Sequence, residues 1–552
     1  MKISLAQQNY HIGNFKYNIS KITKAIEAAK NESADLVVFS ELAICGYIPE
    51  DILFYDSFLM KCRESLAEIA SQTLGIAIII GCPAENTETK GKKIFNAAYF
   101  IENGEIKYTI KKTCLPSYDI FDECRYFEPS SSWEVVEFKG KKIAVTICED
   151  IWNLGPENLY PVTPMDKLKK FNPDFMVNLS ASPFDYSKME AREKILEENV
   201  MTYNIPLFYC NTVGAQTGLV FDGNSCVFGR NGAIIDKLNC FEDDQKFYNL
   251  EQVLNHQREG LPPCEPDSAV YKKDKNISQV YDALKLGISD YFKKMNFKKA
   301  ILGSSGGLDS AVTLAIACDA LGSENVTAVL LPTQYSSNHS VEDAENLSKN
   351  LNNPYHIIPV NSVYNAYLEL LSPVFKNMPF DVTEENLQSR SRGAILMAIA
   401  NKFGYILLNT SNKSEIATGY GTLYGDMTGG LSVLGDCYKT QVYEIASFIN
   451  RNKEIIPSHI IVKPPSAELR PGQKDSDSLP DYNILDNILY QYIDKSHNAE
   501  TIVSNGFDET LVNRVVKMVD KNEYKRAQFC PIIRVSSKVF GKGRRIPVVA
   551  EI

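Results

Sequence analysis

Short apolar runs alternate with amphipathic stretches along most of the chain. In the first half, apolar residues recur at helical spacing from Ile19 to Lys30, which predicts a helix there. The compact apolar run from Leu36 to Phe39 has the length of a buried strand, and similar runs predict strands at 143–147, 175–179 and 207–209. Regular alternation of this kind is typical of an α/β fold.

The alternation fails near the middle of the chain, where REGLPPCEPDSAVYKKDKN is rich in proline and charged residues. Such a composition is typical of a connecting segment. A chain of 552 residues is also too long for one ordinary core. We therefore expect a first domain at 1–255, a linker at 256–276 and a second domain at 277–552.

Beyond the linker the alternation resumes. Apolar runs predict strands at 300–302 and 326–331, and the stretch from Leu308 to Ala320 predicts a helix that Gly322 ends. This is one βαβ unit, so the second domain is expected to contain a parallel sheet. The last segment, KRAQFCPIIRVSSKVFGKGRRIPVV, predicts an extended tail packed on a neighbouring surface or on a nucleotide site.

Charge and cysteine usage narrow the classes of function. The net charge of −10 disfavours a nucleic-acid-binding protein, which usually carries a basic surface. The 13 cysteines are scattered and form no C-x-x-C pair, which predicts neither a disulfide framework nor a zinc site. The first residues lack the pattern of a signal peptide, and no apolar run reaches the ~18 residues of a membrane helix. We expect a cytoplasmic protein without nucleic-acid or membrane partners.

Three segments of the first half carry candidate chemistry. Glu41 lies in VVFSELAICGY, Lys112 in KKTCLPSYDIFDECRYF and Cys148 in IAVTICEDIW. Glu41 and Cys148 each follow a predicted strand, and Lys112 lies three residues before Leu115-Pro116. Strand ends on one edge of a sheet converge on a shared crevice. We therefore expect these three side chains to meet.

The three residue types suit nucleophilic catalysis. A cysteine thiol is mostly un-ionised at neutral pH, so Glu41 would take its proton and later protonate the leaving nitrogen. The positive charge of Lys112 would favour the thiolate and stabilise an oxyanion. Each residue alone is more often structural, since cysteine is commonly buried in cores and charged residues commonly face solvent.

The words F-S-E-L, K-x-x-L-P-x-Y-x-x-F-D-E and C-E-D, in this order, resemble the nitrilase, or carbon–nitrogen hydrolase, superfamily from Met1 to about Leu250. The resemblance implies an αββα sandwich with Glu41 as base, Lys112 as electrophilic support and Cys148 as the nucleophile that forms a thioester. In the glutaminase members of that superfamily, the matching glutamine-binding positions are Tyr118, Phe121, Glu123, Ser182 and Lys188.

A glycine-rich loop opens the second domain. In ILGSSGGLDSAV, Gly306 and Gly307 let the backbone approach a ligand, and the helix that follows directs its N–H groups at an anion. A plain glycine turn is the simpler alternative, but the βαβ setting favours an anion site. The loop is not a Walker A motif because no G-K-[ST] follows. Its S-G-G-x-D-S form resembles the PP-loop of enzymes that split ATP between the α and β phosphates.

Three further strings, NTSNKSEIATGYGTLYGDMTGG, GDCYKTQVYEIA and KPPSAELRPGQKDSDSLPDY, are similar to the NAD synthetase signature over about Val280 to Ile552. The resemblance implies a Rossmann-like domain with Mg²⁺ at Asp309 and Glu415. It implies ATP-binding positions at Ser304, Ser305, Gly306, Gly307, Leu308, Asp309, Ser310, Thr410 and Lys439. It implies candidate deamido-NAD positions at Glu385, Asn386, Arg390, Glu468, Asp475 and Lys538. Ser304 stands where the family usually has leucine or isoleucine.

Together the two resemblances imply a glutamine-dependent NAD synthetase reaction, in which ammonia released in the first domain amidates an adenylate of deamido-NAD in the second. They also imply an intramolecular tunnel and a homo-oligomer, commonly an octamer. One alternative is an amidase joined to a nucleotide-sensing module, which the Asp309 and Glu415 pair disfavours. A second is an ammonia-only synthetase with an inactive first half, which the presence of Glu41, Lys112 and Cys148 disfavours.

Overall fold

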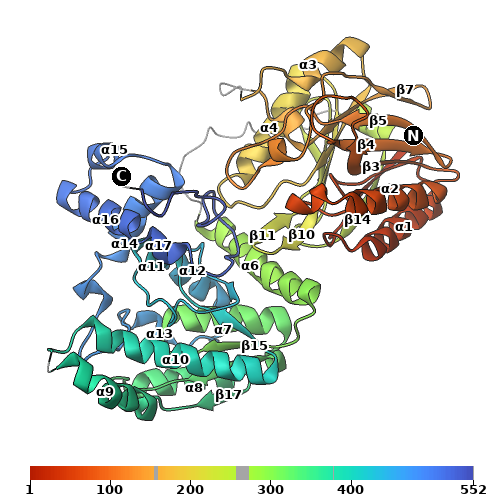
Figure 1. Ribbon diagram of the computed structural model, residues 1–552. Helices are drawn as coiled ribbons and strands as arrows, with labels where there is room; N and C mark the ends of the chain where they lie inside the picture. Colours follow the sequence, from red (N-terminus) through yellow and green to blue (C-terminus); the bar gives the residue numbers. More distant parts are fainter. Residues whose placement is uncertain (155–158, 257–272, 377, 551–552) are drawn as a thin grey trace. The chain divides into compact units, whose positions relative to one another are not determined.

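The structure, a computed structural model, divides into two compact units, Met1–Val270 and Tyr271–Ile552. It describes residues 1–154, 159–256, 273–376 and 378–550 (Figure 1). Most of the expected linker, residues 257–272, lies outside the described residues. The last residues of that expected linker belong to helix α6 (Lys273–Met295).

Two sheets of six strands form the centre of the first unit, counted over its described residues. The strand order of one sheet is β14-β1-β2-β3-β4-β5, and that of the other is β13-β12-β9-β8-β7-β6. The first contains β1 (Lys2–Gln7), β2 (Leu36–Val38), β3 (Ala77–Glu85), β4 (Ile94–Glu102), β5 (Glu105–Lys111) and β14 (Asp244–Asn249). The second contains β6 (Val136–Phe138), β7 (Lys141–Ile147), β8 (Phe175–Ser180), β9 (Leu207–Asn211), β12 (Cys226–Phe228) and β13 (Ile234–Lys237). A short ribbon, β10 (Val213–Gln216) and β11 (Leu219–Asp222), completes the unit.

Alternation along each strand divides the apolar side chains between two cores. Ile79 of β3 packs between the sheets with Val177 and Phe208, whereas Ile78 and Ile80 belong to a second core shared with the helices. The helices of that second core are α1 (Phe15–Asn31) and α2 (Asp56–Ser71). The other sheet is covered by α3 (Pro164–Leu168) and α4 (Met189–Tyr203), and α5 (Leu250–Leu254) follows β14. The predicted αββα sandwich is confirmed.

A parallel sheet with the order β17-β16-β15-β18-β19 forms the centre of the second unit. Its strands are β15 (Ala300–Gly303), β16 (Val326–Leu330), β17 (Tyr355–Ile357), β18 (Ile406–Asn409) and β19 (Leu431–Ser432). The chain runs outward from β15 to β17 and then returns to pair β18 on the other side of β15. Ligands of open α/β sheets bind at such a switch point, so the loop after β15 lies where a nucleotide is expected.

Helices lie on both faces of this sheet (Figure 1). One face packs on α10 (Val382–Phe403), where Leu396 and Ala400 meet Ile301, Val329 and Leu407. The larger helices of the unit also include α7 (Leu308–Leu321), α8 (Asn338–Leu351), α9 (Asn361–Phe375), α12 (Lys439–Ile449) and α16 (Glu509–Lys521). The shorter ones are α11 (Lys413–Thr418), α13 (Ser458–Val462), α14 (Tyr482–Leu489), α15 (Ala499–Ser504) and α17 (Glu523–Arg526). The predicted parallel-sheet domain is confirmed.

The predicted elements lie within or close to the observed ones. The helix predicted from Ile19 to Lys30 lies inside α1, and Gly322 ends α7 as predicted, with a φ of 86°. Among the residues that the structure describes, no helix has both the length and the apolar character needed to cross a bilayer.

Candidate functional site

The first candidate site forms where the two sheets of the sandwich meet. Glu41 follows β2, Lys112 follows β5, and Cys148 begins a 3₁₀ turn directly after β7. Because β2 and β5 belong to one sheet and β7 to the other, the expectation of a single sheet edge is wrong. The carboxylate of Glu41 links the two sheets, since its Oε2 accepts from the Ala181 backbone N–H, 3.0 Å away, at the end of β8.

A buried ion cluster holds Lys112. Its Nζ donates to Glu41 Oε1 at 2.7 Å and to both carboxylate oxygens of Glu123 at 2.9 Å. Burial opposes the charge on Lys112, but the carboxylates of Glu123 and Glu41 outweigh it and raise the pKa of the lysine. Lys112 is therefore a fixed cation between two carboxyl groups.

Glu123 and Asn96 complete the cluster. Glu123, one of the predicted glutamine-binding residues, has a completely buried side chain that also accepts from the Tyr47 hydroxyl at 2.8 Å. The Asn96 amide, in the middle of β4, donates to Glu41 Oε1 at 2.7 Å and to Glu123 Oε2 at 3.3 Å. Sequence reasoning missed Asn96, although a polar residue within the apolar run IFNAAYF was a usable signal.

Cys148 occupies a sharp turn. Its φ is +42°, which is a strained backbone conformation for a residue with a Cβ and is common at functional sites. Burial and the charge of Glu41 raise the pKa of the Cys148 thiol, and Lys112 lowers it only in part. Lys112 thus lowers the pKa of the thiol, as expected, but two carboxylates offset its charge. Cys148 is therefore a thiol before the reaction and needs a base to remove its proton.

Glu41 has the properties of that base. Burial raises its pKa to about 7, with Lys112 opposing the shift and Glu123 adding to it. A carboxylate with a pKa near neutrality both accepts and returns a proton at physiological pH.

Glu149 is a second acidic group beside the nucleophile, and sequence reasoning missed it. It is 4% exposed, and its Oε1 accepts from the hydroxyls of Tyr118 at 2.7 Å and Tyr160 at 3.0 Å. The ring of Phe121 packs edge-on against Tyr118, with centroids 5.7 Å apart. The string C-E-D carried the signal, because an acidic residue directly follows the candidate nucleophile.

The structure separates the last two glutamine-binding candidates. Ser182 adjoins Ala181, which contacts Glu41, and the Ser182 N–H donates to Asn211 Oδ1 at 2.8 Å. Lys188 caps α4, and its Nζ lies 3.9 Å from Asp185 Oδ2 with half of its side chain exposed. Ser182 is therefore beside the cluster, whereas Lys188 pairs with Asp185 on its own segment.

The second candidate site is the loop between β15 and α7. Gly306 has a φ of +75°, and a Cβ there would lie 2.1 Å from the backbone oxygen of Ser340, so only glycine fits. Ser305 and Ser310 brace the loop: their hydroxyl oxygens are 3.2 Å apart, and Ser310 Oγ donates to the Gly307 carbonyl at 3.0 Å. Leu308 begins α7, so the N–H groups of its first turn point at the loop.

Charged groups gather beside this loop. Asp309, in the first turn of α7, forms an ion pair with Lys439 and accepts from the Asn412 amide at 2.9 Å. Asn412 and Glu415 form a capping box at the start of α11, in which the Glu415 N–H donates to Asn412 Oδ1 at 3.0 Å. Burial and then the charge of Asp309 raise the pKa of Glu415.

This pair of carboxylates fits Mg²⁺. The charge of Asp309 raises the pKa of Glu415 even with Lys439 nearby, so a divalent cation would relieve their repulsion. Mg²⁺ usually takes one or two carboxylates and completes its shell with phosphate oxygens and water. Over the described ranges, no group of three or more His, Cys, Asp or Glu side chains is arranged for a metal, so phosphate oxygens would have to complete the site.

Two further ATP candidates flank the loop. Ser304 is 3% exposed, and its Oγ belongs to the buried polar atoms without a hydrogen-bond partner. Thr410 directly follows β18, the strand beside β15, and is half-buried.

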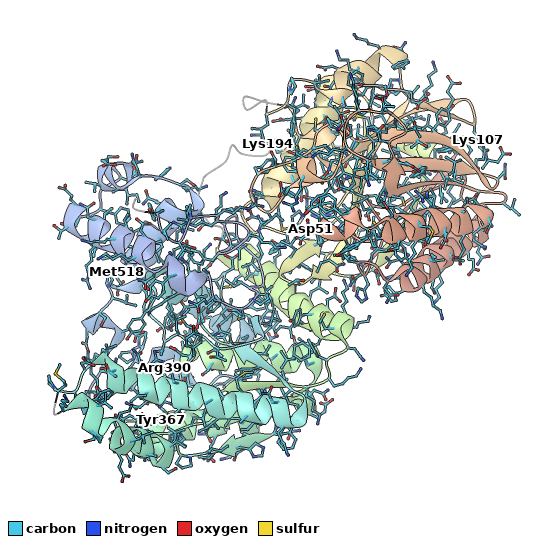
Figure 2. The ribbon with its side chains drawn as sticks, viewed as in Figure 1. Asp51, Lys107, Lys194, Tyr367, Arg390 and Met518 are labelled. Carbon is cyan, nitrogen blue, oxygen red and sulfur yellow. The ribbon has the colours of Figure 1, made fainter. Side chains whose placement is uncertain are left out.

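The deamido-NAD candidates fall into separate groups. Three of them lie on α10, beside the segment at 419–427. Arg390, labelled on α10 in Figure 2, donates to the Leu423 carbonyl at 3.2 Å, and Asn386 accepts from the Thr422 hydroxyl at 2.7 Å. Glu385 Oε1 lies 3.7 Å from Arg470.

Asp475 and Glu468 lie closer to the phosphate loop. Asp475 is buried, accepts from the hydroxyls of Tyr482 at 2.9 Å and Tyr420 at 3.2 Å, and adds to the raised pKa of Glu415. Glu468 Oε1 accepts from Ser340 Oγ at 2.8 Å, and Ser340 is the residue that abuts Gly306.

The C-terminal tail packs inside its own unit. Its Ile532 pairs with Ser432 at the edge of the parallel sheet, and the N–H groups of Val535 and Ser536 donate to Asp436 at 2.8 and 2.7 Å. Asp436 also pairs with the buried Lys413, which adjoins Asn412. Lys538 is half-buried at the end of this anchored stretch.

Both units match known protein families. Residues 2–245 match the carbon-nitrogen hydrolase family and residues 280–529 match the NAD synthase family. A glutamine-dependent NAD(+) synthetase from Synechocystis sp. is 42% identical and covers 99% of this chain and 98% of its own. One from Thermotoga maritima is 41% identical with the same coverage.

Solved structures agree. A glutamine-dependent NAD+ synthetase from Acinetobacter baumannii in complex with ADP is 36% identical, with a TM-score of 0.77 over 99% of this chain and 98% of that one. The structure of a glutamine-dependent NAD(+) synthetase from Cytophaga hutchinsonii, 19% identical, has the same fold, with a TM-score of 0.83 over 100% of this chain and 98% of that one. The chain belongs to the family of glutamine-dependent NAD(+) synthetases.

Proposed function

We propose that the protein hydrolyses glutamine in its first unit and uses the ammonia, with ATP, to amidate deamido-NAD in its second. The observation that carries this proposal is the buried ion cluster of Lys112, Glu41 and Glu123 beside Cys148, in a chain that also holds an anion loop next to Asp309 and Glu415. A nucleotide-sensing module would not require paired carboxylates at the phosphates.

In the first unit, Glu41 takes the Cys148 proton and the sulfur attacks the side-chain amide carbon of glutamine. Lys112, held by Glu123, stabilises the oxyanion. Glu41 then protonates the leaving nitrogen, so ammonia departs and a thioester remains, which water hydrolyses to glutamate and free thiol. We assign Glu123 to the support of Lys112.

We assign recognition of the amino acid to Glu149, whose buried carboxylate is suited to the α-ammonium group. Tyr118 and Phe121 would line the side of the glutamine. Ser182 and Lys188 would bind the α-carboxylate of the glutamine. Tyr118, Phe121, Ser182 and Lys188 are exposed or half-buried, unlike Glu123.

In the second unit, the nicotinate carboxylate attacks the α-phosphorus of ATP and pyrophosphate leaves. Ammonia then attacks the acyl carbon and AMP departs. The loop from Ser304 to Ser310, with Thr410 and Lys439, would hold the phosphates. Asp309 and Glu415 would hold Mg²⁺, which supplies positive charge to the phosphate oxygens when bound. We place deamido-NAD along Glu385, Asn386, Arg390, Glu468, Asp475 and Lys538.

We also propose a homo-oligomer, commonly an octamer in this family, in the cytoplasm. An exposed apolar face on and after α9 supports the association. Its members are Val363, Tyr367 (labelled in Figure 2), Leu370, Val374, Met378 and Phe380, of which Leu370 and Met378 are each 73% exposed. Exposed apolar side chains that gather on one surface are typical of protein interfaces. The cytoplasmic location rests on the scattered cysteines of the sequence.

The test is an assay with ATP, deamido-NAD and glutamine labelled with ¹⁵N at the side-chain amide. The label should appear in the carboxamide of NAD, together with equal amounts of AMP and glutamate. Consumption of glutamine without labelled NAD would refute the proposal.

A further inference from the structure

The two parts of the first site that must act on one carbonyl group lie on different sheets. Cys148 follows β7 and Lys112 follows β5. Small shifts between the sheets would therefore separate the nucleophile from the group that stabilises the oxyanion. A direct connection between these two chain segments would keep them in register.

Asp150 makes that connection. Its Oδ1 accepts from the backbone N–H groups of Thr113 at 3.0 Å and Cys114 at 2.8 Å, the two residues after Lys112. Its Oδ2 accepts from the N–H of Ile147 at 3.1 Å, the residue before Cys148. One carboxylate thus bridges the chain beside the lysine and the chain beside the nucleophile.

The chemistry of Asp150 suits this bridge. The residue is 3% exposed, and burial raises its pKa to about 6, against the opposing effect of the backbone N–H donors. At neutral pH it is an acceptor on both oxygens, matched to donors on both sides. The Ile147 contact also closes the turn in which Cys148 adopts its positive φ.

We propose that Asp150 is a positioning residue that sets the placement of the Cys148 thiol relative to the Lys112 ammonium group, without touching the substrate. This inference rests on the proposed glutaminase function. It makes Asp150 necessary for the chemical step but not for glutamine binding, and irrelevant to the second unit's use of free ammonia.

The test is the variant Asp150→Asn. Its side chain keeps the shape of aspartate, but its NH₂ group faces at least one of the backbone N–H groups that the carboxylate accepts from. The kcat for glutamate release should fall on the order of 10²-fold, as expected for a misplacement of about 1 Å. The KM for glutamine should stay within about threefold, because binding contacts are intact. Ammonia-supported NAD formation by the same preparation should equal that of the wild type.

Asp174→Asn is the matched control. The Asp174 carboxylate accepts from the Lys142 N–H at 2.8 Å, at the other end of the same strand β7, and should leave kcat unchanged. If Asp150→Asn does not fold, Asp150→Glu carries the same test, because the longer side chain keeps both acceptors but shifts them.

The outcomes separate the two proposals. Wild-type protein that releases no glutamate would refute the proposed function. Active wild type with an unchanged kcat in the Asp150 variant, or with only its KM raised, would overturn the positioning role alone. An equal loss of ammonia-supported activity would also overturn it, because the residue would then support the whole fold.

Discussion

The ammonium group of Lys112 donates to Oε1 of Glu41 across 2.7 Å, and neither side chain is exposed to solvent. This contact lets one carboxylate remain ionisable in a buried site, and it places the base next to the group that will stabilise the oxyanion. The pH dependence and the stability of the first unit both depend on it.

The first prediction concerns pH. Only ionised Glu41 accepts the thiol proton, and burial raises its pKa to about 7. Glutamate release should therefore fall about tenfold per pH unit below pH 7 and level off above it. Since the folded pKa exceeds that of the unfolded chain, Glu41 adds stability below about pH 4.5 that is lost as the pH rises through about 7. A pH–rate profile whose acidic limb lies near 4.5 would contradict the assignment.

The second prediction concerns Lys112→Met. Removing the cation leaves two buried carboxylates without their partner, which should lower the free energy of unfolding by about 3–5 kcal/mol and abolish glutaminase activity. Urea unfolding followed in the first unit measures the change. Lys107→Met is the control, because its pair with Glu105 is exposed and should matter little. Unchanged stability of Lys112→Met would mean that the carboxylates are protonated in the native state.

The third prediction separates the two chemistries. Cys148→Ala should eliminate glutamine-supported NAD formation, since no other group supplies the sulfur nucleophile. Ammonia-supported formation should remain within about twofold, because the loop chemistry does not use the thiol. Parallel assays with glutamine and with ammonium chloride measure both. Cys114→Ala, a buried cysteine near the same site, serves as the control and should retain both activities; equal failure of both activities in Cys148→Ala would disprove the division of labour.

The fourth prediction concerns Asp309→Asn. This variant keeps the side-chain shape but loses the charge that pairs with Lys439 and serves the metal. Both glutamine- and ammonia-supported NAD formation should fall by at least about 10²-fold, and the release of AMP and pyrophosphate should fall with them. Asp319→Asn, near the end of the same helix and paired with Lys285, should remain active. Retention of activity in Asp309→Asn would exclude a metal role for the residue.

The fifth prediction concerns assembly. Leu370→Asp places a charge in the middle of the exposed apolar face of α9 and should reduce the molar mass measured by light scattering. Leu74→Asp changes a similarly exposed leucine in the first unit, 66% exposed, and should leave the molar mass unchanged. An unchanged mass for Leu370→Asp would show that this face is not the interface.

The sequence alone was enough to predict the local parts of this architecture. Buried strands such as Leu36–Val38 and the helix begun at Leu308 follow from apolar spacing, because periodicity is a property of neighbouring residues. The candidates Glu41, Lys112 and Cys148 lie in short strings whose order was enough to identify them. The same holds for the Gly306 loop, where the backbone itself requires glycine.

Tertiary structure decided how those parts act together. The pairing of Glu123 with Lys112, the place of Asn96 within the cluster and the bridge made by Asp150 each join residues from separate segments of the chain. These charges and hydrogen bonds matter because the two sheets pack face to face and exclude water. A buried charged or polar group needs a hydrogen-bond or ion-pair partner, since it has lost its contact with solvent. The sequence shows which residues are present and how they are spaced, whereas the packing of the sheets determines which of their side chains come into contact.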